Sequence, residues 1–133
     1  MEVRVLHGPG KQIETIARGH RILTDQPSTE GGDDAGMTPP ELMLSALGAC
    51  AMHYAAEYLR ARNFPIDHLE VHVTAGKSGR PVRLIDFEIT VDAPHLDERH
   101  REGLLRAVDA CLIHRTLREP SEVKINIVSS TFA

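Results

Sequence analysis

The stretch TPPELMLSALGACAM, residues 38–52, decides the fold of this chain because it starts a helix that has no polar face. Residues 38–41 have the pattern of a capping box with proline in the first turn, and residues 63–65 stop the helix near Arg62. No residue of the segment 42–52 is charged. A helix that is apolar on all sides must be covered on all sides, so this helix is predicted to lie at the centre of the protein.

Alternation of apolar and polar residues predicts antiparallel strands before and after this helix. The predicted strands cover residues 3–5, 13–16, 20–23, 69–73, 85–91 and 123–127. A second helix is predicted to begin near Asp97. Its apolar stripe consists of Leu104, Leu105, Val108, Cys111 and Leu112.

The order of these elements predicts an α+β protein with one domain over residues 1–133. Residues 1–25 are expected to form a three-stranded meander, and the polar, Gly-rich residues 26–37 a mobile loop. Residues 38–133 then supply helix, strand, strand, helix and closing strand. An antiparallel sheet that has one solvent-exposed face can cover only one side of the central helix. We therefore expect a homodimer whose two central helices are buried between sheets from both copies.

Composition narrows the classes of partner. Charged residues make up 26% of the 133 residues and the net charge is -4, which argues against nucleic acid or an anionic membrane as a partner. The N-terminus has the alternation of a strand rather than the layout of a secretory signal, and no apolar run is long enough to span a membrane, so we expect a cytoplasmic protein. In a reducing cytoplasm, Cys50 and Cys111 are expected to be free thiols or partners in a transient catalytic disulfide.

These two cysteines have two interpretations. A cysteine in an apolar helix is usually a small packing residue. A reactive thiol needs a nearby cation that lowers its pKa and a second thiol within disulfide reach. On the helix, His53 is the neighbour of Cys50 that offers positive charge. The eight histidines show no metal-ligand spacing, and no glycine motif for phosphate or dinucleotide binding is present, so neither a metal nor a bound cofactor is expected.

A series of short motifs follows along residues 19–127. The motifs are Gly19-His20, Asp25-Gln26-Pro27, Gly31-Gly32, Thr38-Pro39-Pro40-Glu41-Leu42, Ala46-Leu47-Gly48-Ala49-Cys50 and Cys111-Leu112-Ile113-His114. In this order they resemble the OsmC family, which includes the organic hydroperoxide resistance proteins. The resemblance implies an intertwined homodimer in which antiparallel sheets wrap two central helices, with a thiol peroxidase site near the dimer interface.

The resemblance also implies roles for the two cysteines. Cys50 would attack the hydroperoxide and become a sulfenic acid, Cys111 would resolve it as an intramolecular disulfide, and an external dithiol would reduce that disulfide. An apolar pocket would favour organic hydroperoxides over hydrogen peroxide. The alternative, from a different class, is a non-catalytic dimer that binds a small apolar ligand at the interface, with both cysteines as packing residues.

The charged neighbours of the reactive cysteine are also implied by the family. In its characterised peroxidases, an arginine from the N-terminal strands pairs with the cysteine, and a glutamate near the start of the central helix holds the arginine. Here the matching turn offers Lys11, and Arg18 and His53 are the other candidates for the cation. Glu41 is the candidate for the glutamate, although its position also completes the capping box.

Overall fold

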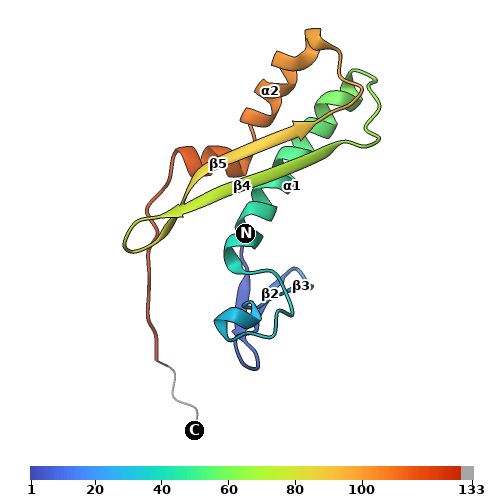
Figure 1. The fold of residues 1–133 in the computed structure, drawn as a ribbon. Helices are drawn as coiled ribbons and strands as arrows, with labels where there is room; N and C mark the ends of the chain where they lie inside the picture. Colours follow the sequence, from blue (N-terminus) through green and yellow to red (C-terminus); the bar gives the residue numbers. More distant parts are fainter. Residues whose placement is uncertain (130–133) are drawn as a thin grey trace.

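The N-terminal part of the molecule is a small antiparallel sheet. The computed structural model describes residues 1–129, and its first three strands are β1 (Arg4–His7), β2 (Ile13–Ala17) and β3 (His20–Thr24), in the order β1-β2-β3 (Figure 1). The tight turn between β2 and β3 uses positive φ angles at Arg18 (50°) and Gly19 (85°), a conformation that glycine adopts without strain. The predicted meander is confirmed.

The segment after β3 is organised around the carboxylate of Asp25, which is only 1% exposed. This carboxylate accepts hydrogen bonds from the backbone amides of Gln26 at 2.8 Å and of Asp33 and Ala35 at 3.1 Å each. The amides of Ala35 and Gln26 are the main cause of the lowered pKa of Asp25. The segment also contains the short helix η1 (Ser28–Glu30). Its predicted mobility stays a prediction.

The central helix α1 (Pro39–Ala61) begins as the sequence predicts. The Glu41 amide donates to the Thr38 hydroxyl at 3.4 Å, and the Thr38 amide donates to the Glu41 carboxylate at 3.3 Å, so both halves of the capping box form. These hydrogen bonds satisfy amides that have no partner inside the helix.

The rest of the body packs on one side of α1. The antiparallel pair β4 (Glu70–Ser78) and β5 (Arg83–Asp92) crosses α1, and η2 (Glu98–His100) leads into α2 (Arg101–Asp109) (Figure 1). The hydrophobic core joins α1 to α2 and consists of Ala51, Ala55, Leu59, Leu104 and Val108. Burying a leucine of this kind contributes about 1.5–3 kcal/mol.

The second long helix is broken, contrary to the prediction of a continuous apolar stripe. α2 ends at Asp109 and α3 (Leu112–Arg118) restarts after Cys111, which has the extended angles φ −52° and ψ 131°. Leu104 and Val108 are the buried residues of α2, and Leu105 on the same helix is exposed. After the break, Cys111 is buried while Leu112 is exposed. The predicted stripe is therefore wrong at Leu105 and Leu112.

The predicted closing strand does not form in the single chain. Residues 119–129 contain no strand, and Val123, Ile125 and Ile127 are 84%, 84% and 94% exposed. The segment runs away from both sheets (Figure 1), and a strand needs a neighbouring edge to pair its backbone groups. The prediction over residues 123–127 is therefore wrong for the described chain taken alone.

The single chain covers only one side of its central helix. Leu47, Ala51, Ala55, Ala56 and Leu59 are buried, whereas Met43, Ala46 and Ala49 are exposed. The N-terminal sheet lies beyond the start of α1 (Figure 1) and exposes apolar residues of its own. These are Val5, Leu6, Ile22 and Leu23.

Candidate active site

The fold brings the two cysteines together within one chain. Cys50 lies on α1 and is partly exposed, whereas Cys111, between α2 and α3, is fully buried. The Cys50 side chain lies close enough to the Cys111 thiol to raise its pKa, and both cysteines are free thiols. Sixty-one positions separate them in the sequence, so their proximity depends on the packing of α2 and α3 against α1.

Burial raises the pKa of the Cys111 thiol above its usual range, and the neighbouring Cys50 adds to the rise. The backbone amides of His114 and Ile113 act in the opposite direction, but the net shift is upward. Cys111 is therefore kept protonated at neutral pH. Cys50 is the more accessible sulfur of the pair, which suits the group that meets a substrate first.

The predicted supporting residues lie apart from one another. Lys11, in the turn after β1, donates to the backbone carbonyl of Glu30, within the N-terminal part. Arg18 is exposed in the turn between β2 and β3 and makes no ion pair within residues 1–129. None of these strands packs extensively on α1, so the single chain does not place Lys11 or Arg18 beside Cys50.

Glu41 and His53 both lie on α1, and neither forms an ion pair within residues 1–129. The Glu41 carboxylate accepts from the Thr38 hydroxyl at 2.7 Å, and this hydrogen bond is the main cause of the lowered pKa of Glu41. Lys77 makes a smaller electrostatic contribution. The exposed His53 ring packs edge-on against Tyr54, with 5.7 Å between ring centroids. In the described chain, Glu41 therefore acts as a capping residue.

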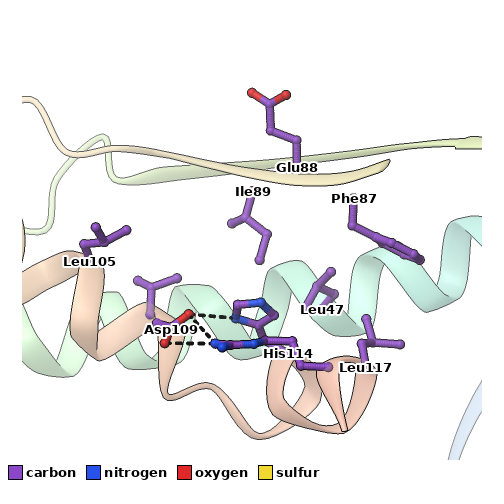
Figure 2. A pocket seen from close by; sticks show the side chains of 10 residues that line it. Leu47, Phe87, Glu88, Ile89, Leu105, Asp109, His114 and Leu117 are labelled. Atoms are coloured by element: carbon purple, nitrogen blue, oxygen red, sulfur yellow. Dashed lines mark hydrogen bonds and ion pairs between the residues drawn. The ribbon is translucent and has the colours of Figure 1, made fainter. Parts of the chain in front are cut away.

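A pocket of about 410 Å³ lies between β5, α1 and the α2–α3 segment, and neither cysteine is among its lining residues. Its lining includes Leu47, three residues before Cys50 on α1, and His114, three residues after Cys111. Figure 2 shows apolar side chains along the walls, while the Glu88 carboxylate points away. The apolar walls consist of Leu47, Phe87, Ile89, Leu105, Val108 and Leu117.

Polar groups occupy one end of this pocket. The Asp109 carboxylate lies 3.0 Å from Nη1 of Arg118 and 3.6 Å from Nδ1 of His114 (Figure 2). The sequence named His114 only as part of the motif at residues 111–114 and gave no signal for Asp109 or Arg118. Their nine-residue separation has no helical periodicity, and only the break between α2 and α3 brings them together.

Two further observations concern other kinds of site. Among residues 1–129, no three or more His, Cys, Asp or Glu side chains gather into a group that could hold a metal ion. None of the helices described in this range combines the length and apolarity needed to cross a bilayer.

The fold is shared with several solved structures. A protein from Psychrobacter arcticus named for osmotic stress induction and detoxification response aligns with a TM-score of 0.77 and 18% identity, over 86% of this chain and 85% of that chain. An OsmC-like protein from Mycoplasma pneumoniae aligns with a TM-score of 0.72 and 23% identity, over 94% and 92%. An organic hydroperoxide resistance protein OsmC from Legionella pneumophila aligns with a TM-score of 0.67 and 15% identity, over 89% and 88%.

Sequence comparison leads to the same group. No curated protein matches the chain significantly. The family model described as OsmC-like protein matches residues 31–126, which include the capping box, both cysteines and the break between α2 and α3. Because this match spans well over half of the sequence, the chain belongs to the OsmC-like family.

Proposed function

We propose that this protein is a thiol-dependent peroxidase that reduces organic hydroperoxides. The observation that carries the proposal is the proximity of the partly exposed Cys50 to the buried Cys111 within one chain, close enough for Cys50 to raise the pKa of Cys111. A lone packing cysteine needs no second thiol beside it, whereas a cysteine peroxidase needs one within disulfide reach.

The proposed cycle has three steps, and its electrons come from thiols. The Cys50 thiolate attacks the terminal oxygen of the hydroperoxide, the O–O bond breaks, and the alcohol leaves with a proton while Cys50 becomes a sulfenic acid. The Cys111 sulfur then attacks Cys50, the S–O bond breaks, and water leaves. An external dithiol reduces the disulfide and restores both thiols. The cycle uses no metal and no bound cofactor.

The proposed substrate class follows from the surroundings of the thiols. The pocket lined by Leu47 and His114 has six apolar wall residues, and such walls favour an alkyl or aryl group over water. Several structural neighbours are named organic hydroperoxide resistance proteins, which supports the same class by analogy.

We also propose that the working unit is an intertwined homodimer. Apolar side chains are exposed on the N-terminal sheet, on the open side of α1 and in the segment 123–127, and a second copy would cover them. In such a dimer, the N-terminal sheet of one copy would bring Arg18 or Lys11 toward Cys50 of the other. Arg18 is the stronger candidate because a guanidinium stays charged when it is partly buried. The cytoplasm, with its reducing thiol pool, is the expected compartment.

The proposal is tested by hydroperoxide consumption with a dithiol reductant. We expect the parent protein to consume cumene hydroperoxide faster than hydrogen peroxide. Cys50→Ser should abolish turnover, and Cys111→Ser should stop after one oxidation with a dimedone adduct on Cys50. Consumption by both variants at the parental rate would show that these thiols are not the catalysts.

The alternative is a non-catalytic dimer that binds a small apolar ligand. The observation that favours it is the position of Lys11 and Arg18 in the N-terminal part, which leaves the Cys50 thiol of the single chain without either cation. The pH dependence of Cys50 alkylation separates the two functions. A midpoint below the free-thiol value of about 8.5 that rises in Arg18→Ala supports the enzyme. An unshifted midpoint supports the binding protein.

A further inference from the structure

The helix α3, which begins directly after Cys111, is too short to be stable alone. α3 has seven residues, and isolated helices shorter than about 12–15 residues are marginal in water. It is followed by residues 119–129, which form no helix or strand and are exposed. The orientation of α3 therefore depends on its contacts with the rest of the body.

Asp109 provides a polar contact that links the end of α2 to the end of α3. It is the last residue of α2, and its two carboxylate oxygens lie 3.0 and 3.2 Å from Nη1 of Arg118, the last residue of α3. The Oδ1 atom also lies 3.6 Å from Nδ1 of His114, in the third position of α3 (Figure 2). Three charged or polar groups from two helices thus converge on the break between them.

Cys111 lies inside this linked segment, and its backbone is tied to both helices. Its amide donates to the Val108 carbonyl of α2 at 3.0 Å, and its carbonyl accepts from the Arg115 amide of α3 at 3.0 Å. A rotation of α3 would consequently move the Cys111 sulfur relative to Cys50. The carboxylate of Asp109 opposes such a rotation from only two residues away.

We propose that Asp109 is a positioning residue for disulfide formation between Cys111 and Cys50. By holding α3 against the end of α2, it keeps the Cys111 sulfur facing Cys50. In turnover, Asp109 thereby speeds the step in which the S–S bond forms and the S–O bond of the sulfenic acid breaks. The Cys111 proton leaves with that oxygen as water. This part of the inference rests on the proposed function.

The geometry can be tested without peroxide, using the aromatic disulfide dithiobis-nitrobenzoate (DTNB). Exchange with Cys50 releases a first thionitrobenzoate and leaves a mixed disulfide; attack by Cys111 then releases a second one. We expect Asp109→Asn to slow the second release about three- to fivefold, as expected for a partly exposed ion pair, and to leave the first release unchanged. The Cys111→Ser variant should release only one thionitrobenzoate.

A matched control is available on the same helix. Glu102 of α2 pairs with Arg106 at 3.8 Å and makes no link to α3, so Glu102→Gln removes a carboxylate without loosening α3. The Glu102→Gln variant should release the second thionitrobenzoate at the same rate as the parent. Because the side chains of Arg118 and Asp109 are 58% and 53% exposed, salt at ~1 M should slow the second release of the parent toward that of Asp109→Asn. A general loss of stability would not respond to salt in this way.

The inference is overturned if Asp109→Asn and Arg118→Gln both release the second group at the parental rate, or if Glu102→Gln is equally slow. If Asp109→Asn fails to fold, Arg118→Gln carries the test alone. If DTNB does not reach Cys50, the same comparison is made at equilibrium in a dithiothreitol redox buffer. There Asp109→Asn should shift the protein severalfold toward the dithiol, and equal equilibria would overturn the inference.

Failure of the proposed function gives a different result. A parent that forms the disulfide with DTNB but consumes no hydroperoxide would refute the peroxidase and leave the positioning role intact. A parent that consumes hydroperoxide while Asp109→Asn matches it in both releases would refute the positioning role alone.

Discussion

Two segments with the same alternating pattern have opposite environments in this molecule. In β5, Ile89 and Val91 pack against the core formed by α1 and α2. In the segment 123–127, Val123 and Ile125 alternate in the same way, yet both are 84% exposed. The difference shows that an alternating pattern identifies the apolar face of a strand but does not bury it. Burial also requires a neighbouring strand and a helix that packs on that face.

The same contrast separates the body of the molecule from its periphery. The body consists of α1, β4, β5, α2 and α3, and the periphery consists of the N-terminal sheet and the C-terminal segment. Between α1 and α2 the apolar side chains meet one another, while those of the N-terminal sheet and the C-terminal segment face water in the single chain. The body thus has the contacts of a folded core, and the periphery has exposed apolar residues that the described chain does not cover. A second copy of the chain is our proposed source of the missing contacts.

The largest expected effect comes from placing a charge in the body. Leu47 is 1% exposed, and burying an unpaired carboxylate costs several kcal/mol, a large part of a typical stability of about 5–15 kcal/mol. We expect Leu47→Asp to unfold the protein, as measured by circular dichroism during heating. Arg60→Asp is the control, because it places the same carboxylate on α1 at a position that is 58% exposed and already charged, and this variant should stay folded. A folded Leu47→Asp variant with the parental melting temperature would contradict this placement of the core.

The next largest effect should appear in self-association rather than folding. If residues 123–127 are covered by a second copy, Ile125→Asp should weaken the dimer at least about tenfold, because the cost of burying the charge exceeds 1.4 kcal/mol. Sedimentation at a series of concentrations measures the dissociation constant. Lys124→Gln changes the opposite face of the same segment and should leave the constant unchanged. A parent protein that is monomeric at micromolar concentration would show that no second copy covers residues 123–127.

A smaller loss of stability is expected where α1 and α2 touch. A methyl group added at Gly103 would collide with the Tyr58 hydroxyl and ring, and the Tyr58 hydroxyl donates to the His100 carbonyl at 3.3 Å. Gly103→Ala should therefore lower the free energy of unfolding by about 1–3 kcal/mol, as overpacking usually does. Urea unfolding provides the measurement. Adding Tyr58→Leu should recover part of the loss. If Gly103→Ala is neutral, the helices are not in contact at this point.

The smallest expected effect concerns the loop of the N-terminal part. The pKa of Asp25 is lowered by hydrogen bonds from backbone amides, so the charged carboxylate stabilises the fold above its ordinary value of 3.8. This stabilisation is lost as pH falls through the lower folded value. The difference in unfolding free energy between the parent and Asp25→Asn should hence be largest at neutral pH and shrink below pH 3.8. A difference that does not change with pH would show that the charge of Asp25 does not stabilise the loop.

Much of the body could be predicted from local chemistry. The capping box at Thr38 and Glu41 fixed the start of α1, and period-two alternation located β4 and β5. Both signals involve residues close together in the sequence. Of the motifs that carried the family resemblance, those from Gly31-Gly32 onward lie within residues 31–126, which the OsmC-like model matches.

The break before α3 and the open C-terminal segment could not be predicted in the same way. The stripe through Val108, Cys111 and Leu112 continues a helical pattern, and the extended angles of Cys111 have no warning glycine or proline. The link from Asp109 to Arg118 exists only because of that break. For residues 123–127, the sequence indicates a strand but does not say which chain supplies its neighbour.

The most direct test of the central claim is the state of the thiols after one turnover. The reduced protein receives one equivalent of cumene hydroperoxide without reductant, the remaining thiols are alkylated, and the peptides are analysed by mass spectrometry. The proposed function predicts a Cys50–Cys111 disulfide, with the loss of two hydrogen atoms and one equivalent of alcohol formed. Two alkylated cysteines beside unreacted hydroperoxide would contradict it.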